Sequence, residues 1–125
     1  MNDTLGHRAG DMVLQRMAAL LRESMVTGVD IPGRNGGDEF CAIVRGGHKV
    51  AALMRAHRFC LAVRESDLGV KMPITASVGV AAYPYDATEA SELLEIADAA
   101  MYHSKRAGRD RVSFAVDRAT FAVYE

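Results

Sequence analysis

A glycine pair between two short apolar segments is the feature that most restricts the fold of this chain. Asn35-Gly36-Gly37 is a tight-turn signal, and strands are expected on either side of it, over about residues 30–34 and 40–44. Strands joined by so short a turn pair antiparallel. Pro32 has no N–H group to donate to a ladder, which favours an edge position or an irregular start for the first strand.

Three helices and further strands are expected around this hairpin. Apolar residues recur at helical spacing over about residues 9–23, 49–65 and 89–107, and Gly108 would end the last of these helices. We expect strands at residues 74–82 and 112–116, an irregular lead-in at 1–8, and a turn with a second short strand within 117–125. The order helix, hairpin, helix, strand, helix, strand predicts an α+β fold and not a doubly wound parallel sheet.

Composition is that of an ordinary globular domain. The chain has 125 residues, half of them hydrophobic and a quarter charged. Its net charge of -1 gives no general attraction to nucleic acid or to an acidic membrane, although a local phosphate site stays open. No long apolar run or signal peptide occurs, so a cytoplasmic location without direct membrane contact is predicted. Cys41 and Cys60 are expected to be buried free thiols.

The hairpin turn also carries residues suited to a polyphosphate. Gly36 and Gly37 let backbone N–H groups approach a ligand closely. Asp38 and Glu39 follow at once, and carboxylates beside bare amides can hold a polyphosphate together with its divalent metal. The alternative is a solvated turn with ordinary charges.

A second cluster of polar residues lies near the start of the first expected helix. Asn2 and Asp11 could bind a guanine base, which offers hydrogen-bond donors to a carboxylate and acceptors to an amide. The alternative is structural, with Asp11 capping the helix and suiting its dipole, and Asn2 favouring a turn.

A third cluster consists of two cations at the end of the third expected helix. Lys105 and Arg109 are four residues apart, so they could face the same way and grip a terminal phosphate. The alternative is a pair of surface cations that the helix dipole favours near its C-terminus.

Taken in order, four strings resemble the GGDEF family. Residues 2–11 resemble its NDxxGHxxGD segment, 34–40 its RxGGDEF hairpin, 75–80 its TxSxGV strand and 97–110 its ADxALYxAKxxGRN segment. In the last string Met101 replaces Leu and Asp110 replaces Asn. The resemblance places the GGDEF domain at residues 1–116, with a C-terminal tail at 117–125.

The resemblance implies a diguanylate cyclase, which condenses two GTP molecules into cyclic di-GMP and releases pyrophosphate. Each domain carries half of the reaction, so a second GGDEF domain is the expected partner in a homodimer. The implied fold is similar to the polymerase palm, a mostly antiparallel sheet with helices packed on its faces. Asp38 would bind Mg²⁺ or Mn²⁺ and help deprotonate the attacking hydroxyl, and Glu39 would support the metal site. Gly36 and Gly37 would let the backbone lie against the phosphates.

The other clusters receive roles from the same resemblance. Asn2 and Asp11 would bind guanine, and His7 would line the nucleotide pocket. Lys105 and Arg109 would hold the terminal phosphates.

The family also has features that these 125 residues do not contain. It places a strand with a metal-binding aspartate before the NDxxGH segment, followed by a phenylalanine-lysine pair. We therefore expect that the chain is a fragment of a longer protein or that its start is wrongly assigned, and that its activity alone is impaired. A stand-alone degenerate protein, with residues 120–124 filling a sheet edge, is the other account. Two other functions stay open, a module that binds GTP and regulates a partner domain, and a structural piece that binds no nucleotide.

The string at residues 27–30 departs from the family's RxxD inhibitory site for product. Asp30 is present, but Thr27 stands in place of the arginine and cannot make a bidentate contact. The sequence therefore predicts no feedback inhibition through that site.

Overall fold

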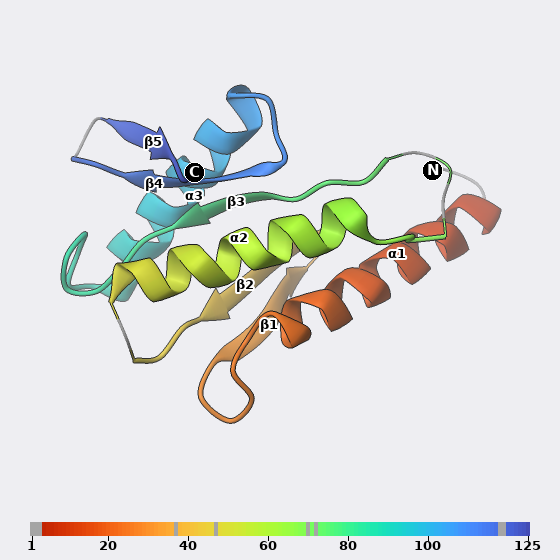
Figure 1. Cartoon of the computed structure of the whole chain (residues 1–125), viewed down its shortest axis with the longest axis horizontal. Helices are drawn as coiled ribbons and strands as arrows, with labels where there is room; N and C mark the ends of the chain where they lie inside the picture. The colour runs from red at the N-terminus through yellow and green to blue at the C-terminus, as the bar shows by residue number, and fades with distance from the viewer. Residues whose placement is uncertain (1–3, 37, 47, 70, 72, 118–119) are drawn as a thin grey trace.

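The computed structural model describes residues 4–36, 38–46, 48–69, 71, 73–117 and 120–125, apart from the side chains of residues 4–7 and 35. Figure 1 shows the elements found within these ranges. In chain order they are α1 (Thr4–Glu23), β1 (Ile31–Gly36), β2 (Glu39–Ile43), α2 (Lys49–Glu65), β3 (Ser77–Val80), α3 (Ala90–Arg106), β4 (Arg111–Ala115) and β5 (Phe121–Val123). Within the described ranges, no helix has both the length and the apolar character needed to cross a bilayer.

The strands form two separate sheets. β1 and β2 pair antiparallel, with a register shift between Arg34 and Gly36. β3 pairs parallel with β4, and β4 pairs antiparallel with β5. The parallel pair is joined through α3, as a crossover connection requires. Among the described residues no ladder joins β2 to β3, so the hairpin stands apart from the three-stranded sheet.

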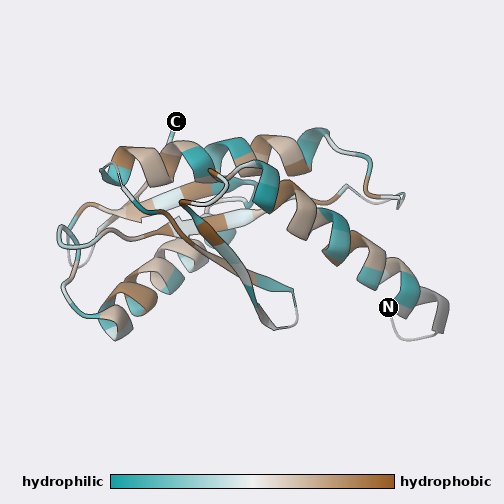
Figure 2. Cartoon of the chain, turned by 90° about the horizontal axis from the view of Figure 1, so that it is seen from below, coloured by the Kyte–Doolittle hydropathy of each residue, from teal (hydrophilic) through white to brown (hydrophobic). Residues whose placement is uncertain are grey.

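Helices cover both faces of the three-stranded sheet. Figure 2 shows α2 and α3 on opposite sides of the strands, and both helices contact β3 and β4. The main core lies where α1, α2 and the strands meet, because each of these elements turns an apolar face inward. Its buried members include Val13, Leu21, Leu53, Phe59, Cys60, Val63, Val80 and Val112.

Gly79 lets α3 lie directly against β3. A Cβ atom at this position would come within 2.0 Å of the carbonyl oxygen of Ala97 and 2.2 Å of the amide nitrogen of Met101. These are backbone atoms of α3, so they cannot move aside as a flexible side chain would. The hydroxyl of Ser104 also donates to the carbonyl of Val78 over 2.9 Å. The glycine therefore sets the distance between helix and sheet.

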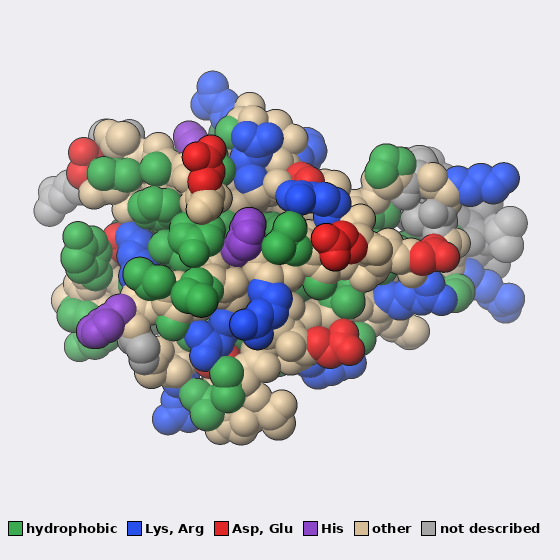
Figure 3. All heavy atoms as spheres, in the orientation of Figure 1, with side chains coloured by type: hydrophobic (Ala, Val, Ile, Leu, Met, Phe, Trp, Pro, Cys, Tyr) green, Lys and Arg blue, Asp and Glu red, His purple; other side chains and the backbone are tan. Residues whose placement is uncertain are grey.

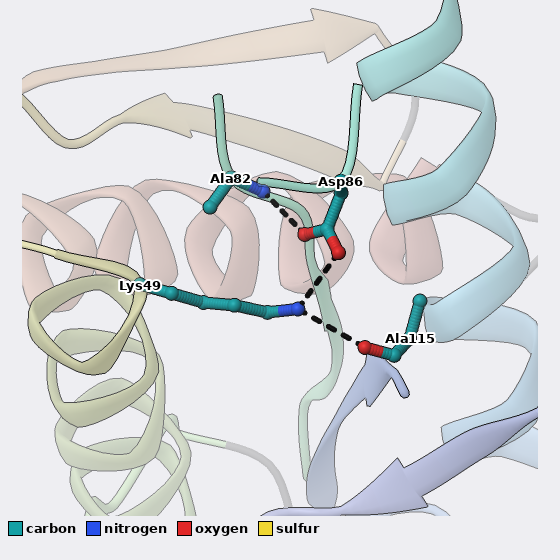
Figure 4. Close-up of polar contacts among 4 residues, drawn as sticks. All are labelled: Lys49, Ala82, Asp86 and Ala115. Atoms are coloured by element: carbon teal, nitrogen blue, oxygen red, sulfur yellow. Dashed lines mark hydrogen bonds and ion pairs between the residues drawn. The ribbon is translucent and has the colours of Figure 1, made fainter. Parts of the chain in front are cut away.

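A buried ion pair ties three distant segments together, as Figure 4 shows. Lys49 Nζ, at the start of α2, lies 2.9 Å from Asp86 Oδ1 and donates to the carbonyl of Ala115 over 3.0 Å. Asp86 Oδ2 accepts the amide of Ala82 over 2.7 Å. Only 15% of the Lys49 side chain and 6% of the Asp86 side chain are exposed. Neither charge is left unpaired, as buried charges require.

One surface of the molecule carries exposed apolar side chains. Figure 3 shows such side chains gathered near the beginning of α2, with acidic and basic groups interspersed elsewhere on this face. Large apolar residues of this region that stay exposed are Val50, Met54, Tyr85 and Val116. Interspersed charge agrees with the absence of a strong net charge.

The α+β prediction and the order of elements are confirmed, and two details are wrong. Residues 4–8 belong to α1 and are not an irregular lead-in. Extending an existing helix gains one hydrogen bond per residue, while a glycine such as Gly6 costs only about 1 kcal/mol. β3 spans four residues rather than 74–82, because its ladder covers only the residues that face β4. The short strand expected within 117–125 is β5.

The two cysteines are free, as expected. Cys60 is buried, whereas Cys41 on β2 is half-buried.

Candidate functional site

The hairpin tip presents two carboxylates beside a glycine backbone. Gly36 ends β1 with φ +109°, a conformation that side-chain-bearing residues rarely adopt, and a Cβ atom there would meet nothing within 4 Å. Asp38 and Glu39 are both exposed, and Glu39 pairs with Gly36 across the turn. Figure 2 shows this tip projecting from the body of the molecule. Gly37 lies outside the described residues.

The donor chemistry of the tip suits a hard divalent cation. Carboxylate oxygens are the ligands that Mg²⁺ and Mn²⁺ prefer, and Mg²⁺ usually binds through one or two carboxylates plus substrate phosphates and water. Asp38 and Glu39 offer such a pair. No cluster of three histidine, cysteine, aspartate or glutamate side chains capable of holding a metal occurs among the described residues. Two carboxylates would need the ligand and water to complete the coordination of such a metal, and the metal site stays a prediction.

The helical position of Asp11 does not agree with a role in capping the helix or in stabilising its dipole. α1 begins at Thr4, so Asp11 lies well beyond the first turn, and none of the described residues of that turn is acidic. The dipole of a helix acts mainly within its first and last turns. Asp11 is exposed and stays available for a ligand. Asn2 and the side chain of His7 lie outside the described residues.

Lys105 and Arg109, the two cations at the end of α3, do not share a helix face. Lys105 is exposed in the last turn of α3, but the helix ends at Arg106, so Arg109 lies beyond it. Helical spacing therefore does not by itself align the two side chains, and their joint grip on a phosphate stays a prediction. Arg109 is exposed with φ +65°, and its amide donates to the carbonyl of Ser104 over 2.9 Å. This bond ties the turn back to the helix end.

The candidate residues that the structure describes do not share a described cavity. Figure 1 shows the start of α1 at one end of the molecule, whereas the hairpin tip and the turn after α3 lie closer to its middle. A cavity of about 320 Å³ lies between the end of α2 and the loop that follows, and includes Arg64, Lys71 and Thr75 in its lining. The hairpin acids are not part of that lining. The assignments of Asn2, His7, Asp11, Gly36, Gly37, Asp38, Glu39, Lys105 and Arg109 stay predictions.

Arg64 is a polar residue that the sequence pattern did not single out. Its Nε atom lies 2.7 Å from Asp110 Oδ2, in the turn that also holds Arg109. The hydrogen bond and the charge of Asp110 raise the pKa of the Arg64 guanidinium. A basic residue in the last turn of a helix is common, so nothing in the sequence distinguished Arg64 from its neighbours.

Asp30 is a buried structural residue. It is the acidic residue of the string at 27–30, which departs from the family's RxxD inhibitory site. Its carboxylate is fully buried, 2.7 Å from Arg55 Nε, and accepts the amides of Val26 over 2.8 Å and Arg45 over 3.1 Å. Burial by itself would raise its pKa, but these two amides and the guanidinium together lower the pKa below its ordinary value. The oxygens of Asp30 are therefore occupied and do not face a ligand.

The family model described as "Diguanylate cyclase, GGDEF domain" matches residues 1–111. The chain belongs to the GGDEF domain family. It is 38% identical over 116 residues to Diguanylate cyclase A of Treponema denticola, and the aligned region covers 90% of this chain and 31% of that protein. It is 35% identical over 120 residues to the cyclic di-GMP phosphodiesterase NbdA of Pseudomonas aeruginosa, covering 91% of this chain and 15% of that protein. This GGDEF domain thus spans a third or less of the length of these curated relatives.

Solved GGDEF domains have the same fold. The GGDEF domain of YfiN from Pseudomonas aeruginosa matches with a TM-score of 0.76 at 33% identity, over 89% of this chain and 71% of that one. The GGDEF domain of DgcB from Caulobacter crescentus, in complex with c-di-GMP, matches with a TM-score of 0.75 at 30% identity, over 89% and 67% of the two chains. The predicted family and fold class are therefore confirmed.

Proposed function

We propose that this GGDEF domain is the catalytic module of a diguanylate cyclase, which condenses two GTP molecules into cyclic di-GMP. The observation that supports the proposal most directly is the intact, exposed pair Asp38 and Glu39 at a hairpin tip opened by glycine. Curated relatives named as diguanylate cyclases, such as Diguanylate cyclase A of Treponema denticola, support the same activity. A cytoplasmic location is part of this proposal, because GTP is a cytoplasmic substrate.

The hairpin would carry the chemical step. Asp38 and Glu39 would hold Mg²⁺ or Mn²⁺, and the bound ion would offset the charge that develops on the α-phosphoryl group. The Asp38 carboxylate would accept the proton of the 3′-hydroxyl as that oxygen forms a bond to the α-phosphorus of the other nucleotide. The bond from that phosphorus to the bridging oxygen breaks, and pyrophosphate leaves. Because each hydroxyl attacks the opposite nucleotide, two GGDEF domains must face one another.

The flanking elements would bind the nucleotide. Asn2 and Asp11 would take guanine at the start of α1, with His7 lining the pocket. Lys105 and Arg109 would hold the terminal phosphates through charge-assisted hydrogen bonds. Correct placement of both ends of GTP lowers the entropic part of the barrier.

Replacing Asp38 in the full-length protein tests the proposal. Asp38→Ala should lower the rate of cyclic di-GMP formation at least about a hundredfold, because it removes a metal ligand and a proton acceptor. The matched control is Glu95→Ala, an exposed acid on α3, which should leave the rate unchanged. Unchanged product formation by Asp38→Ala would exclude the catalytic role.

The 125 residues alone should turn GTP over slowly. They do not contain the aspartate and the lysine that the family places before the NDxxGH segment, and no ladder joins β2 to β3 among the described residues. Incubating this chain with GTP and Mg²⁺ or Mn²⁺ checks the point. Brisk turnover would refute the impairment.

A second candidate is a GGDEF module that binds GTP and regulates a partner domain without catalysis. It is favoured by the relative NbdA, whose name is that of a cyclic di-GMP phosphodiesterase although it matches 91% of this chain. Calorimetry on the full-length protein separates the two candidates. GTP binding without product formation would support the regulatory module.

A further inference from the structure

The turn that follows α3 is held in an unusual backbone conformation. Gly108, Arg109 and Asp110 have φ values of +125°, +65° and +50° in succession. Glycine adopts such values freely, and aspartate tolerates them, but arginine does so only where neighbouring contacts impose it. Something must therefore hold the turn in place.

Two of the contacts that hold the turn are local. The amide of Arg109 donates to the carbonyl of Ser104 over 2.9 Å. The side chain of Arg111 donates from Nε to the carbonyl of Arg109 over 2.7 Å. Both contacts fix the backbone of Arg109, but neither joins the turn to another helix.

The third contact comes from α2. Arg64 Nε lies 2.7 Å from Asp110 Oδ2, across 46 residues of sequence. The other oxygen, Asp110 Oδ1, is buried and has no hydrogen-bond partner in the described part of the chain. The carboxylate of Asp110 is thus oriented from one side by Arg64. Because 47% of the Arg64 side chain is exposed, the pair adds little to overall stability, and its effect is mainly on local geometry.

We propose that Arg64 is a positioning residue for phosphate binding in this GGDEF domain. Through its ion pair with Asp110 it holds the turn after α3, and it thereby places the guanidinium of Arg109 for the terminal phosphates of GTP. The inference rests on the proposed function, in which Arg109 binds those phosphates. Asp110 stands where the family motif has asparagine, which could not form an ion pair with Arg64.

Geometry explains why an ion pair remote from the ligand matters. A guanidinium binds phosphate through donors in a fixed fork, so a small displacement of its backbone loses a hydrogen bond. A site held by supporting contacts therefore binds more tightly than the same residues on a loose turn. Arg64 also lines the cavity beside the loop that follows α2.

Calorimetry on the full-length protein tests the proposal. The probes are guanosine and a GTP analogue with a methylene group between the α and β phosphorus atoms, which cannot react. Arg64→Met should weaken binding of the analogue about threefold to tenfold, since part of one phosphate contact is lost, and should leave guanosine binding unchanged. Arg64→Lys, which keeps the charge, should restore part of the affinity. Arg58→Met, an exposed arginine on the same helix, is the matched control and should bind like the unaltered protein.

A double-substitution cycle adds a test of the pair itself. Arg64→Met combined with Asp110→Asn should weaken binding no more than Arg64→Met alone, because both changes remove one contact. Equal analogue binding by Arg64→Met and the unaltered protein, with Arg109→Met weakened, would overturn the positioning role and leave the proposed function intact. Failure of the unaltered protein to bind the analogue would overturn the proposed function and this inference with it.

Discussion

Asp30→Asn is expected to destabilise the domain far more than a change of one atom suggests. The carboxylate is fully buried and accepts from three donors, the amides of Val26 and Arg45 and the guanidinium of Arg55. An asparagine of the same shape keeps one accepting oxygen. Its NH₂ group would face a donor, and the charge of Arg55 would lose its partner.

The magnitude follows from the burial of the two partners. Breaking a fully buried ion pair costs about 3–5 kcal/mol, and 20% of the Arg55 side chain stays exposed, so water relieves part of that cost. We expect a loss of about 3 kcal/mol in the free energy of unfolding, measured by urea titration with circular dichroism at pH 7. Asp98→Asn, an exposed position on α3, is the control and should change this free energy by less than about 0.5 kcal/mol.

The effect should also depend on pH. The pKa of Asp30 is lowered in the folded state, so its stabilisation is fully present above the unfolded value of about 4 and is lost as the pH falls through the folded pKa. Asparagine does not titrate, so the difference between the two proteins should shrink below about pH 4. A difference under about 1 kcal/mol at pH 7, or one that does not change with acid, would refute the reasoning.

Three further substitutions or reactions test the packing. Gly79→Ala should destabilise the domain by about 3 kcal/mol or more in urea titration, whereas Gly33→Ala, whose Cβ meets no atom closer than 3.8 Å, should be tolerated. Burial raises the pKa of the Cys60 thiol to about 12, so at pH 8 it should resist a thiol reagent until the protein unfolds, and the half-buried Cys41 should react first. Lys49→Met should lower the free energy of unfolding by about 3 kcal/mol, because it leaves the buried partner carboxylate unpaired. Wild-type stability of this last variant would show that the ion pair is dispensable.

Local sequence signals predicted most of the fold. The helix at residues 49–65 follows from its apolar periodicity, and its bounds agree with α2. The turn at Asn35-Gly36-Gly37 predicted the antiparallel pairing of β1 and β2. The length of β3 was not predictable in this way, because a ladder depends on which strand lies beside it.

Contacts between distant residues account for what the sequence did not predict at the site. Motif strings identified the residues of the hairpin tip and of the turn after α3. They did not reveal that Asp30 is bound by Arg55, or that Arg64 reaches Asp110 from another helix. Each of these pairs depends on how α2 packs against other segments, and single charged residues on a helix carry no signal of their partner.

The separation of the hairpin from the three-stranded sheet has a consequence for hydrogen exchange. Among the described residues, β1 and β2 share backbone hydrogen bonds only with each other, whereas β4 is bonded on both sides. Amides of the hairpin should therefore exchange through local opening, at a lower free energy than those of β4, which require global unfolding. The segment that carries Asp38 and Glu39 would then shift relative to the three-stranded sheet at a low cost in free energy.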